Sequence, residues 1–269
     1  MKQLVIFISL FLFTSAFAQK NMQWRAVYQY KRILNEKQKA KNDSLIKARP
    51  EMAAIIKKLS KRFNNRTYFL DFTKAESVYK EKARLEKDGG SFMRDRILYK
   101  NLTQKTFTEK RPFLEKDFLV VDTLPDYHWK VTGETKNIGN YTVIKAVGTE
   151  KIKKSKTPKN AKDTKGEPKN VEKEVIAWFT PELPISNGPG KYWGLPGLIM
   201  EVDKDGAVIL LKELIINPKK FNKIERPEKG QKVNEKEYKE IMKKERLKME
   251  KMFKNRRHKK GSDRVIIKM

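Results

Sequence analysis

Residues 198–216 read LIMEVDKDGAVILLKELII, and this stretch decides the fold class. Its two apolar runs, 198–202 and 207–216, are rich in the β-branched and aliphatic side chains found in strands. Between them stands Asp205-Gly206, a dipeptide that suits the two-residue turn of a tight hairpin. The stretch therefore predicts two antiparallel strands that follow one another directly.

Upstream of this hairpin, short strand-like segments follow each other in quick succession. Residues 24–34 and 68–78 alternate apolar and polar side chains, so each range predicts one strand. Further short segments, separated by turn residues, are 97–107, 118–121, 127–132, 141–147 and 175–179. This cadence predicts a mainly β (α+β) fold, built as an antiparallel β-meander or a half-barrel.

Two segments have helical rather than strand-like spacing. After Pro50, which suits the first turn of a helix, apolar residues recur every three or four positions up to Phe63. We expect one packed N-terminal helix here, preceded by a polar stretch at 35–44 that leaves the first strand. Near the other end, Asn234 is an N-cap candidate with Glu237 three residues later, and lysines dominate up to Lys260. This pattern predicts a basic C-terminal helix.

Residues 151–173 interrupt the strand pattern. They lack a cluster of large apolar side chains, and Lys, Pro, Asn, Asp and Gly dominate. Because such a segment buries too little surface to offset the entropy of ordering, we interpret it as a disordered basic insertion. The chain then divides into a signal peptide at 1–18, a β domain at 19–220 that carries the insertion, and a basic helical extension at 221–269.

The first residues have the three parts of a signal peptide. Lys2 gives a charged start, residues 4–13 are apolar, and Ala16-Phe17-Ala18 is a cleavage site of the A-x-A kind. The apolar run is shorter than the roughly 20 residues that span a bilayer, and no later stretch is apolar enough to do so. We therefore expect cleavage near Ala18, a periplasmic or secreted protein, and no transmembrane segment.

Composition limits the chemistry and the partners. The chain has no cysteine, which excludes disulfides and thiolate catalysis. Its formal net charge of +29 attracts polyanions, and for an exported protein these are anionic glycans or lipid head groups such as those of lipopolysaccharide. No nucleic acid is expected as a partner. The alternative is that lysine serves as a solubilising surface residue without a specific anionic partner.

Turn chemistry explains the motif Gly194-Leu195-Pro196-Gly197-Leu198-Ile199. Pro196 presets the first central dihedral of a type II turn, and Gly197 is expected to supply the positive φ of the second. The two leucines on either side of this turn would then point inward. We interpret the motif as architectural, since it contains no nucleophile, acid or base. The functional alternative is an exposed groove floored by Tyr192 and Trp193, with Trp178 and Trp129 in the same binding surface.

This segment resembles the GLPGLI family of secreted Bacteroidota proteins. The motif at 194–199 is present in full, between an aromatic strand that contains Trp178 and a hydrophobic strand, and Trp129 precedes it. The resemblance implies a mainly antiparallel β fold in the cell envelope. It also implies an envelope protein or an outer-membrane transport system as partner, and a molecular role that is largely unassigned. The insertion at 151–173 and the basic helix after Phe221 depart from the family pattern.

Candidates for a metal or catalytic site are few. The two histidines, His128 and His258, stand in no metal-binding or nucleophile signature, and we expect His128 on one face of a half-buried strand. Met242, Met249 and Met252 fall on one helical face, and thioethers suit Cu(I). A flexible apolar docking stripe is the favoured interpretation of these methionines. We therefore expect no cofactor.

These observations favour a non-enzymatic envelope protein, a binding or accessory module at the outer membrane. Two alternatives stay open. One is a polyanion binder that holds lipopolysaccharide or glycans with the insertion and the C-terminal helix. The other is a copper-handling envelope protein that uses the methionine stripe.

Overall fold

The structure is a computed structural model, and it describes residues 22–64, 66–82, 96–113, 115–154, 169–219, 221 and 223–262. The predicted signal peptide, its cleavage site and the last residues, 263–269, lie outside the described residues. None of the helices in the described part is long and apolar enough to cross a membrane.

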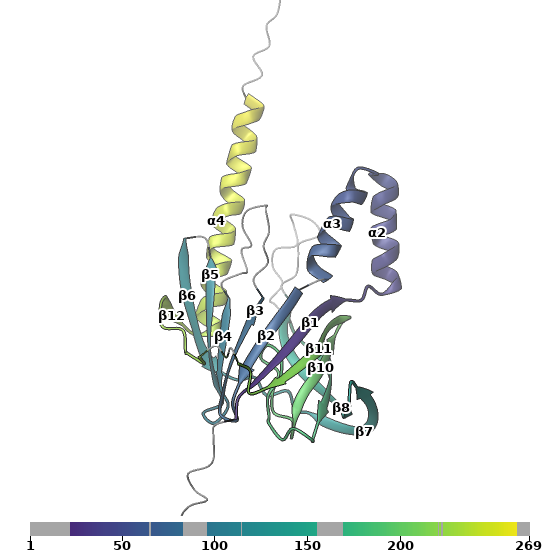
Figure 1. Cartoon of the computed structure of the whole chain (residues 1–269). Coiled ribbons are helices and arrows are strands. Elements are labelled where there is room, and N and C mark those ends of the chain that lie inside the picture. The colour runs from purple at the N-terminus through teal and green to yellow at the C-terminus, as the bar shows by residue number, and fades with distance from the viewer. Residues whose placement is uncertain are drawn as a thin grey trace, which may run out of the picture.

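The described chain forms one open sheet of 12 strands, shown in Figure 1. In space the strands follow the order β12-β6-β5-β4-β3-β2-β1-β11-β10-β9-β8-β7. Their bounds are β1 Trp24–Arg32, β2 Arg66–Phe72, β3 Glu76–Glu81, β4 Ile97–Asn101, β5 Thr106–Phe113, β6 Lys116–Thr123, β7 Lys130–Ile138, β8 Tyr141–Lys154, β9 Lys169–Thr180, β10 Leu198–Lys204, β11 Ala207–Ile216 and β12 Gln231–Val233. The prediction of a mainly β fold is confirmed, and the sheet is not a closed barrel.

Two meanders make up this sheet. Strands β1–β6 form one and β7–β11 the other, and the two join where β1 pairs antiparallel with β11. The hairpin predicted from residues 198–216 is confirmed, because β10 pairs with β11 and Asp205 and Gly206 both have positive φ, at 52° and 76°. Two positive φ angles in succession are what a type I′ turn requires. The decisive stretch thus lies at the centre of the sheet.

Two predicted strands are each divided in the structure by a polar turn residue. The strand expected at 68–78 breaks after Phe72, where the Thr73 hydroxyl accepts hydrogen bonds from the backbone N–H groups of Ala75 and Glu76. The segment at 97–107 breaks after Asn101, whose side-chain oxygen accepts from the N–H of Gln104. Such local side-chain bonds offer the backbone an alternative to the strand ladder.

The insertion is shorter at both ends than predicted. Residues 151–154 extend β8 and residues 169–173 belong to β9, with Lys151 opposite Glu172 and Glu150 opposite Lys173. Opposite charges on facing strands support this pairing even without apolar side chains. The prediction of disorder is wrong for these ends, and residues 155–168 lie outside the described residues.

Two N-terminal helices stand where one was predicted, α2 Glu36–Ala48 and α3 Met52–Asn64. The polar stretch at 35–44, expected only to lead away from the first strand, starts α2 with a capping box in which Asn35 and Gln38 bond each other's backbone. Because α2 has no buried residue, its sequence contains no apolar stripe from which a helix could be predicted. α3 ends just before β2 begins and is tied to β1 through Asn64, whose side-chain oxygen accepts from the N–H of Arg32. The predicted basic C-terminal helix is α4, Glu235–Ser262.

Candidate functional site

Two buried side chains hold the long connection between β9 and β10, residues 181–197, and the start of β10 that follows it. The Tyr28 hydroxyl donates to the carbonyl of Ile199 at 2.6 Å. The Lys100 ammonium donates to the carbonyl of Gly188, also at 2.6 Å. Both side chains are fully buried, so β4 holds the connection itself and β1 holds the start of β10 that follows it.

The motif residues anchor the end of this connection in two separate parts of the core. Leu195 and Ile199 belong to a cluster with Phe179, whereas Leu198 packs in the cluster that contains Tyr28. Both leucines are buried, at 2% and 0% exposure, so they do point inward. Pro196 is exposed at the surface between them.

The expected role of Gly197 is wrong. Its φ is not positive, and the glycine with positive φ in the motif is Gly194, at 94°. A Cβ on Gly197 would lie 2.0 Å from the carbonyl oxygen of Thr180, so close approach of β9 excludes any side chain there. The backbone at Gly197 is therefore constrained by a tertiary contact rather than by a type II turn.

Three of the four predicted binding aromatics come together, and all three are engaged in packing. Trp129 Nε1 donates to the carbonyl of Trp193, and Trp193 Nε1 donates to the carbonyl of Pro125, each at 2.8 Å. The Tyr192 ring lies 5.1 Å from that of Tyr127. These contacts hold residues 125–129 against Tyr192 and Trp193, directly before the motif.

The remaining predicted residues lie elsewhere. Trp178 lies on β9 under the ammonium of Lys136, 4.2 Å from its ring. His128 is not on a strand: it occupies an exposed turn before β7, with φ of 49°. The methionines lie on α4, where Met242 and Met249 are half-buried and Met252 is exposed. Within the described residues, no group of three or more His, Cys, Asp or Glu side chains could hold a metal ion.

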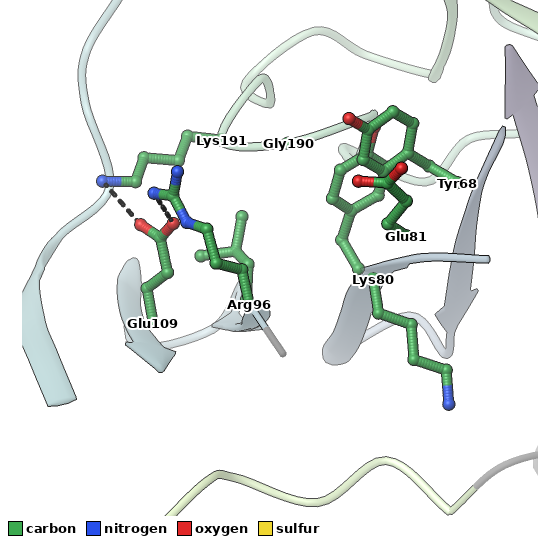
Figure 2. Close-up of a pocket in the computed structure, with 9 residues that line it drawn as sticks. Tyr68, Lys80, Glu81, Arg96, Glu109, Gly190 and Lys191 are labelled. Atoms are coloured by element: carbon green, nitrogen blue, oxygen red, sulfur yellow. Dashed lines mark hydrogen bonds and ion pairs between the residues drawn. The ribbon is translucent and has the colours of Figure 1, made fainter. Parts of the chain in front are cut away.

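A cavity of about 210 Å³ opens on the sheet beneath residues 190–191 of the connection, and Figure 2 shows it. One wall is the stacked pair Tyr68 and Tyr79, whose ring centroids are 5.0 Å apart. Leu98 forms part of the lining between the walls, and the other wall is charged. The complete lining is Tyr68, Tyr79, Lys80, Glu81, Arg96, Leu98, Glu109, Gly190 and Lys191.

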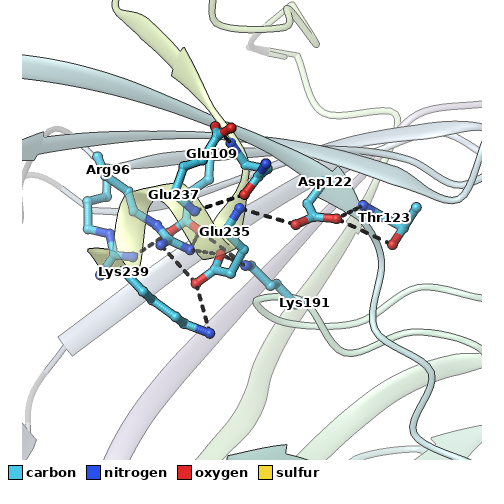
Figure 3. A network of polar contacts seen from close by, with 10 residues as sticks. Arg96, Glu109, Asp122, Thr123, Lys191, Glu235, Glu237 and Lys239 are labelled. Carbon is cyan, nitrogen blue, oxygen red and sulfur yellow. Dashed lines mark hydrogen bonds and ion pairs between the residues drawn. The ribbon is translucent and has the colours of Figure 1, made fainter. Parts of the chain in front are cut away.

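The charged wall belongs to a network of five side chains, which we call the α4 ion network: Arg96, Glu109, Arg111, Lys191 and Glu235 (Figure 3). Glu109 receives hydrogen bonds from both arginines, and Arg111 also binds Glu235 with two parallel bonds of 3.1 and 2.8 Å. Lys191 lies 3.5 Å from the Glu109 carboxylate and 3.2 Å from that of Glu235. Three cations of this network share its two carboxylates, and Lys239 on α4 also lies 3.6 Å from Glu235.

Burial and charge act against each other in this network. Burial would raise the pKa of Glu109, but the hydrogen bond from Arg111 and the charges of Arg96 and Lys191 outweigh it and hold the pKa below its ordinary value. The pKa of Lys191 is lowered by burial and by the neighbouring Arg111, although two carboxylates oppose the shift. Glu109 therefore stays ionised at neutral pH, and it is surrounded by three cationic side chains.

Sequence reasoning did not find this pocket. A signal was present on β5, where Glu109 and Arg111 occupy the same alternating positions as the buried Phe107. Charged residues in a core-facing register are unusual unless they are paired. The partners, however, come from Lys191 in the connection and from Glu235 in α4, and no local pattern in the sequence links those positions.

Residues 129–201 match the model of a family described as a protein of unknown function (Porph_ging). This Porph_ging segment contains β7, β8, β9, the connection and the motif. Strands β1–β6, which carry most of the pocket lining, lie outside it.

Comparison with solved structures gives two matches to PNGF-II, in the C2 and P2₁ space groups. Their TM-scores are 0.48 and 0.49, with sequence identities of 13% and 12%. Each match covers 82% of this chain but only 32% and 33% of the PNGF-II chains, so the protein spans about a third of their length. No curated protein matches the chain.

Proposed function

We propose that the protein is a non-enzymatic binding module of the bacterial cell envelope, exported after cleavage near Ala18, and that its ligand site is the pocket between Tyr68 and Lys191. The proposal rests on the contacts of the Glu109 carboxylate. This carboxylate is already engaged by Arg96, Arg111 and Lys191, so it supports a binding rather than an acid–base role. The match of residues 129–201 to a family of unknown function leaves the role to be argued from the site.

The ligand class follows from the two walls. The cation excess at Arg96 and Lys191 favours one acidic group, and Glu81 at the opposite wall can accept hydrogen bonds from hydroxyls. The tyrosine pair offers an aromatic surface between them, and the cavity volume of about 210 Å³ suits a single ring. We therefore propose an acidic saccharide unit as the ligand.

Calorimetric titration of residues 19–269 with glucuronate, and with glucose as the neutral analogue, tests the proposal. We expect measurable heat with glucuronate and none with glucose. Arg96→Gln should abolish the signal, because it removes a pocket cation. Arg226→Gln is the matched control, since Arg226 bonds Thr108 rather than a pocket residue. Equal binding of both sugars, or full binding by Arg96→Gln, would contradict the proposed site.

A second measurement addresses the absence of catalysis. Incubation with a chromogenic glucuronide should release no product above the buffer rate. Release that disappears in Glu109→Gln or Glu81→Gln would show that the pocket carries out hydrolysis, and the non-enzymatic class would then be wrong.

A further inference from the structure

The first two turns of α4 are fixed to the sheet. β12 pairs parallel with β6 immediately before the helix, and the Asn234 side chain accepts from the N–H of Glu237, which bonds back to the N–H of Asn234. Tyr238 packs edge-on against Phe118, with ring centroids 5.5 Å apart, and lies under the Arg111 guanidinium. Ile241 packs beside it on the same apolar cluster.

The rest of α4 continues past this contact. Figure 1 shows the helix leaving the sheet beside β5 and β6 and extending well beyond their ends. At about 1.5 Å per residue, a helix of 28 residues is about 42 Å long, far more than the two docked turns need. In this part the ion pairs of Arg246 with Glu250 and of Lys248 with Glu245 stay within the helix.

Two properties distinguish the projecting part, residues 243–262. It contains ten Lys or Arg and two Glu, a net charge of +8. It also continues the apolar stripe of the docked turns, because Met249 and Met252 follow Ile241 and Met242 at helical spacing. Met252 is 56% exposed, and Leu247 on another side of the helix is 49% exposed. Helices that bind at a membrane interface combine cations with apolar side chains that enter the head-group layer.

We propose that residues 243–262 form an arm that binds an anionic lipid surface, with the lysines at the phosphates and Met249 and Met252 in the head-group layer. Charge complementarity selects an anionic surface. The methionines favour lipid over a soluble polyanion, because a glycan chain offers no apolar layer in which to bury them. Glu235, the first residue of α4, belongs to the α4 ion network. The helix that carries the arm therefore also contacts residues that line the pocket.

Vesicle sedimentation of residues 19–269 tests the arm. The probes are vesicles of phosphatidylglycerol with phosphatidylcholine, and vesicles of phosphatidylcholine alone. We expect binding to the first only. The triple substitution K244Q/K248Q/K251Q should weaken it about a hundredfold, since each cation near an anionic surface contributes roughly a factor of five. The matched control is K37Q/K39Q/K41Q on α2, whose lysines are also exposed.

The double substitution M249S/M252S separates lipid from soluble polyanion. It should weaken vesicle binding at least about threefold, which reflects loss of burial in the head-group layer, and leave retention on heparin unchanged. Two results together would mean that the arm is a general polyanion binder. The methionine variant would bind vesicles as wild type does, and the α4 lysine variant would lose vesicle binding and heparin binding equally. Vesicle binding that neither α4 variant alters would overturn the proposal altogether. Circular dichroism and thermal melting establish that each variant is folded.

Discussion

The buried ammonium of Lys100 donates a hydrogen bond to the carbonyl of Gly188, 88 positions later in the chain. This bond ties β4, in one meander, to the connection that leads into the motif of the other. Its donor has 0% exposure, and burial lowers the pKa of Lys100 to about 7. The contribution of this bond to the free energy of unfolding therefore depends on pH.

We expect the free energy of unfolding to rise between pH 7 and pH 9. The folded-state pKa of Lys100 is about 7, whereas an unfolded lysine titrates near pH 10.4, so in this window the unfolded chain binds more protons. Stability rises with pH wherever that holds. Lys100→Met should remove most of the rise, and Lys74→Met, at an exposed site, should keep it. Urea unfolding at several pH values measures both, and parallel curves for wild type and Lys100→Met would refute the assignment.

Substitution of Gly197 should be among the most destabilising changes in the motif. A Cβ there would collide with the Thr180 carbonyl, and we expect Gly197→Ala to cost about 3 kcal/mol in the free energy of unfolding. Gly139→Ala is the comparison, because Gly139 has positive φ but open space around it, and it should cost only about 1 kcal/mol. Gly197→Asn gives the sharpest test: asparagine tolerates positive φ, so it would rescue stability only if a type II turn were the constraint.

Local signals predicted the parts of the fold that depend on neighbouring residues. Asp205-Gly206 placed the central hairpin, and Asn234 with Glu237 placed the start of α4, where both capping bonds are present. Each of these features is decided within four residues, so the sequence alone contains the necessary information. The same holds for the mainly β class, which follows from period-two alternation.

The features that the sequence did not reveal depend on distant contacts or on polar side chains. α2 has no apolar stripe, and its start is decided by hydrogen bonds of Asn35. The constraint on Gly197 comes from Thr180, on a different strand. Glu109 and Glu235 share Arg111 although they are far apart in sequence, and only the folded sheet brings them together. The pocket therefore could not be predicted from motifs.

Docking of α4 should weaken in acid, and Glu235 should be the main cause. Burial alone would raise its pKa, but the bonds and charges of Arg111 and Lys191 outweigh this and lower the pKa to about 2. A carboxyl whose folded pKa is depressed contributes stability above its unfolded pKa, near 4.3, and loses that contribution as the pH falls toward 2. Because the side chain is partly exposed, we expect Glu235→Gln to cost only about 2 kcal/mol at pH 7.

Hydrogen exchange at the amides of residues 238–242 measures this docking directly. At pH 7, Glu235→Gln should exchange faster there than wild type, and the difference should shrink as the pH is lowered below about 4, because protonation of wild-type Glu235 removes the same ion pairs. Glu240→Gln is the matched control, since Glu240 is exposed on the same helix and should leave the exchange unchanged. If both variants exchanged at the wild-type rate, the contacts of Tyr238 and Ile241 with the sheet would suffice to hold α4, and the α4 ion network would serve the pocket alone.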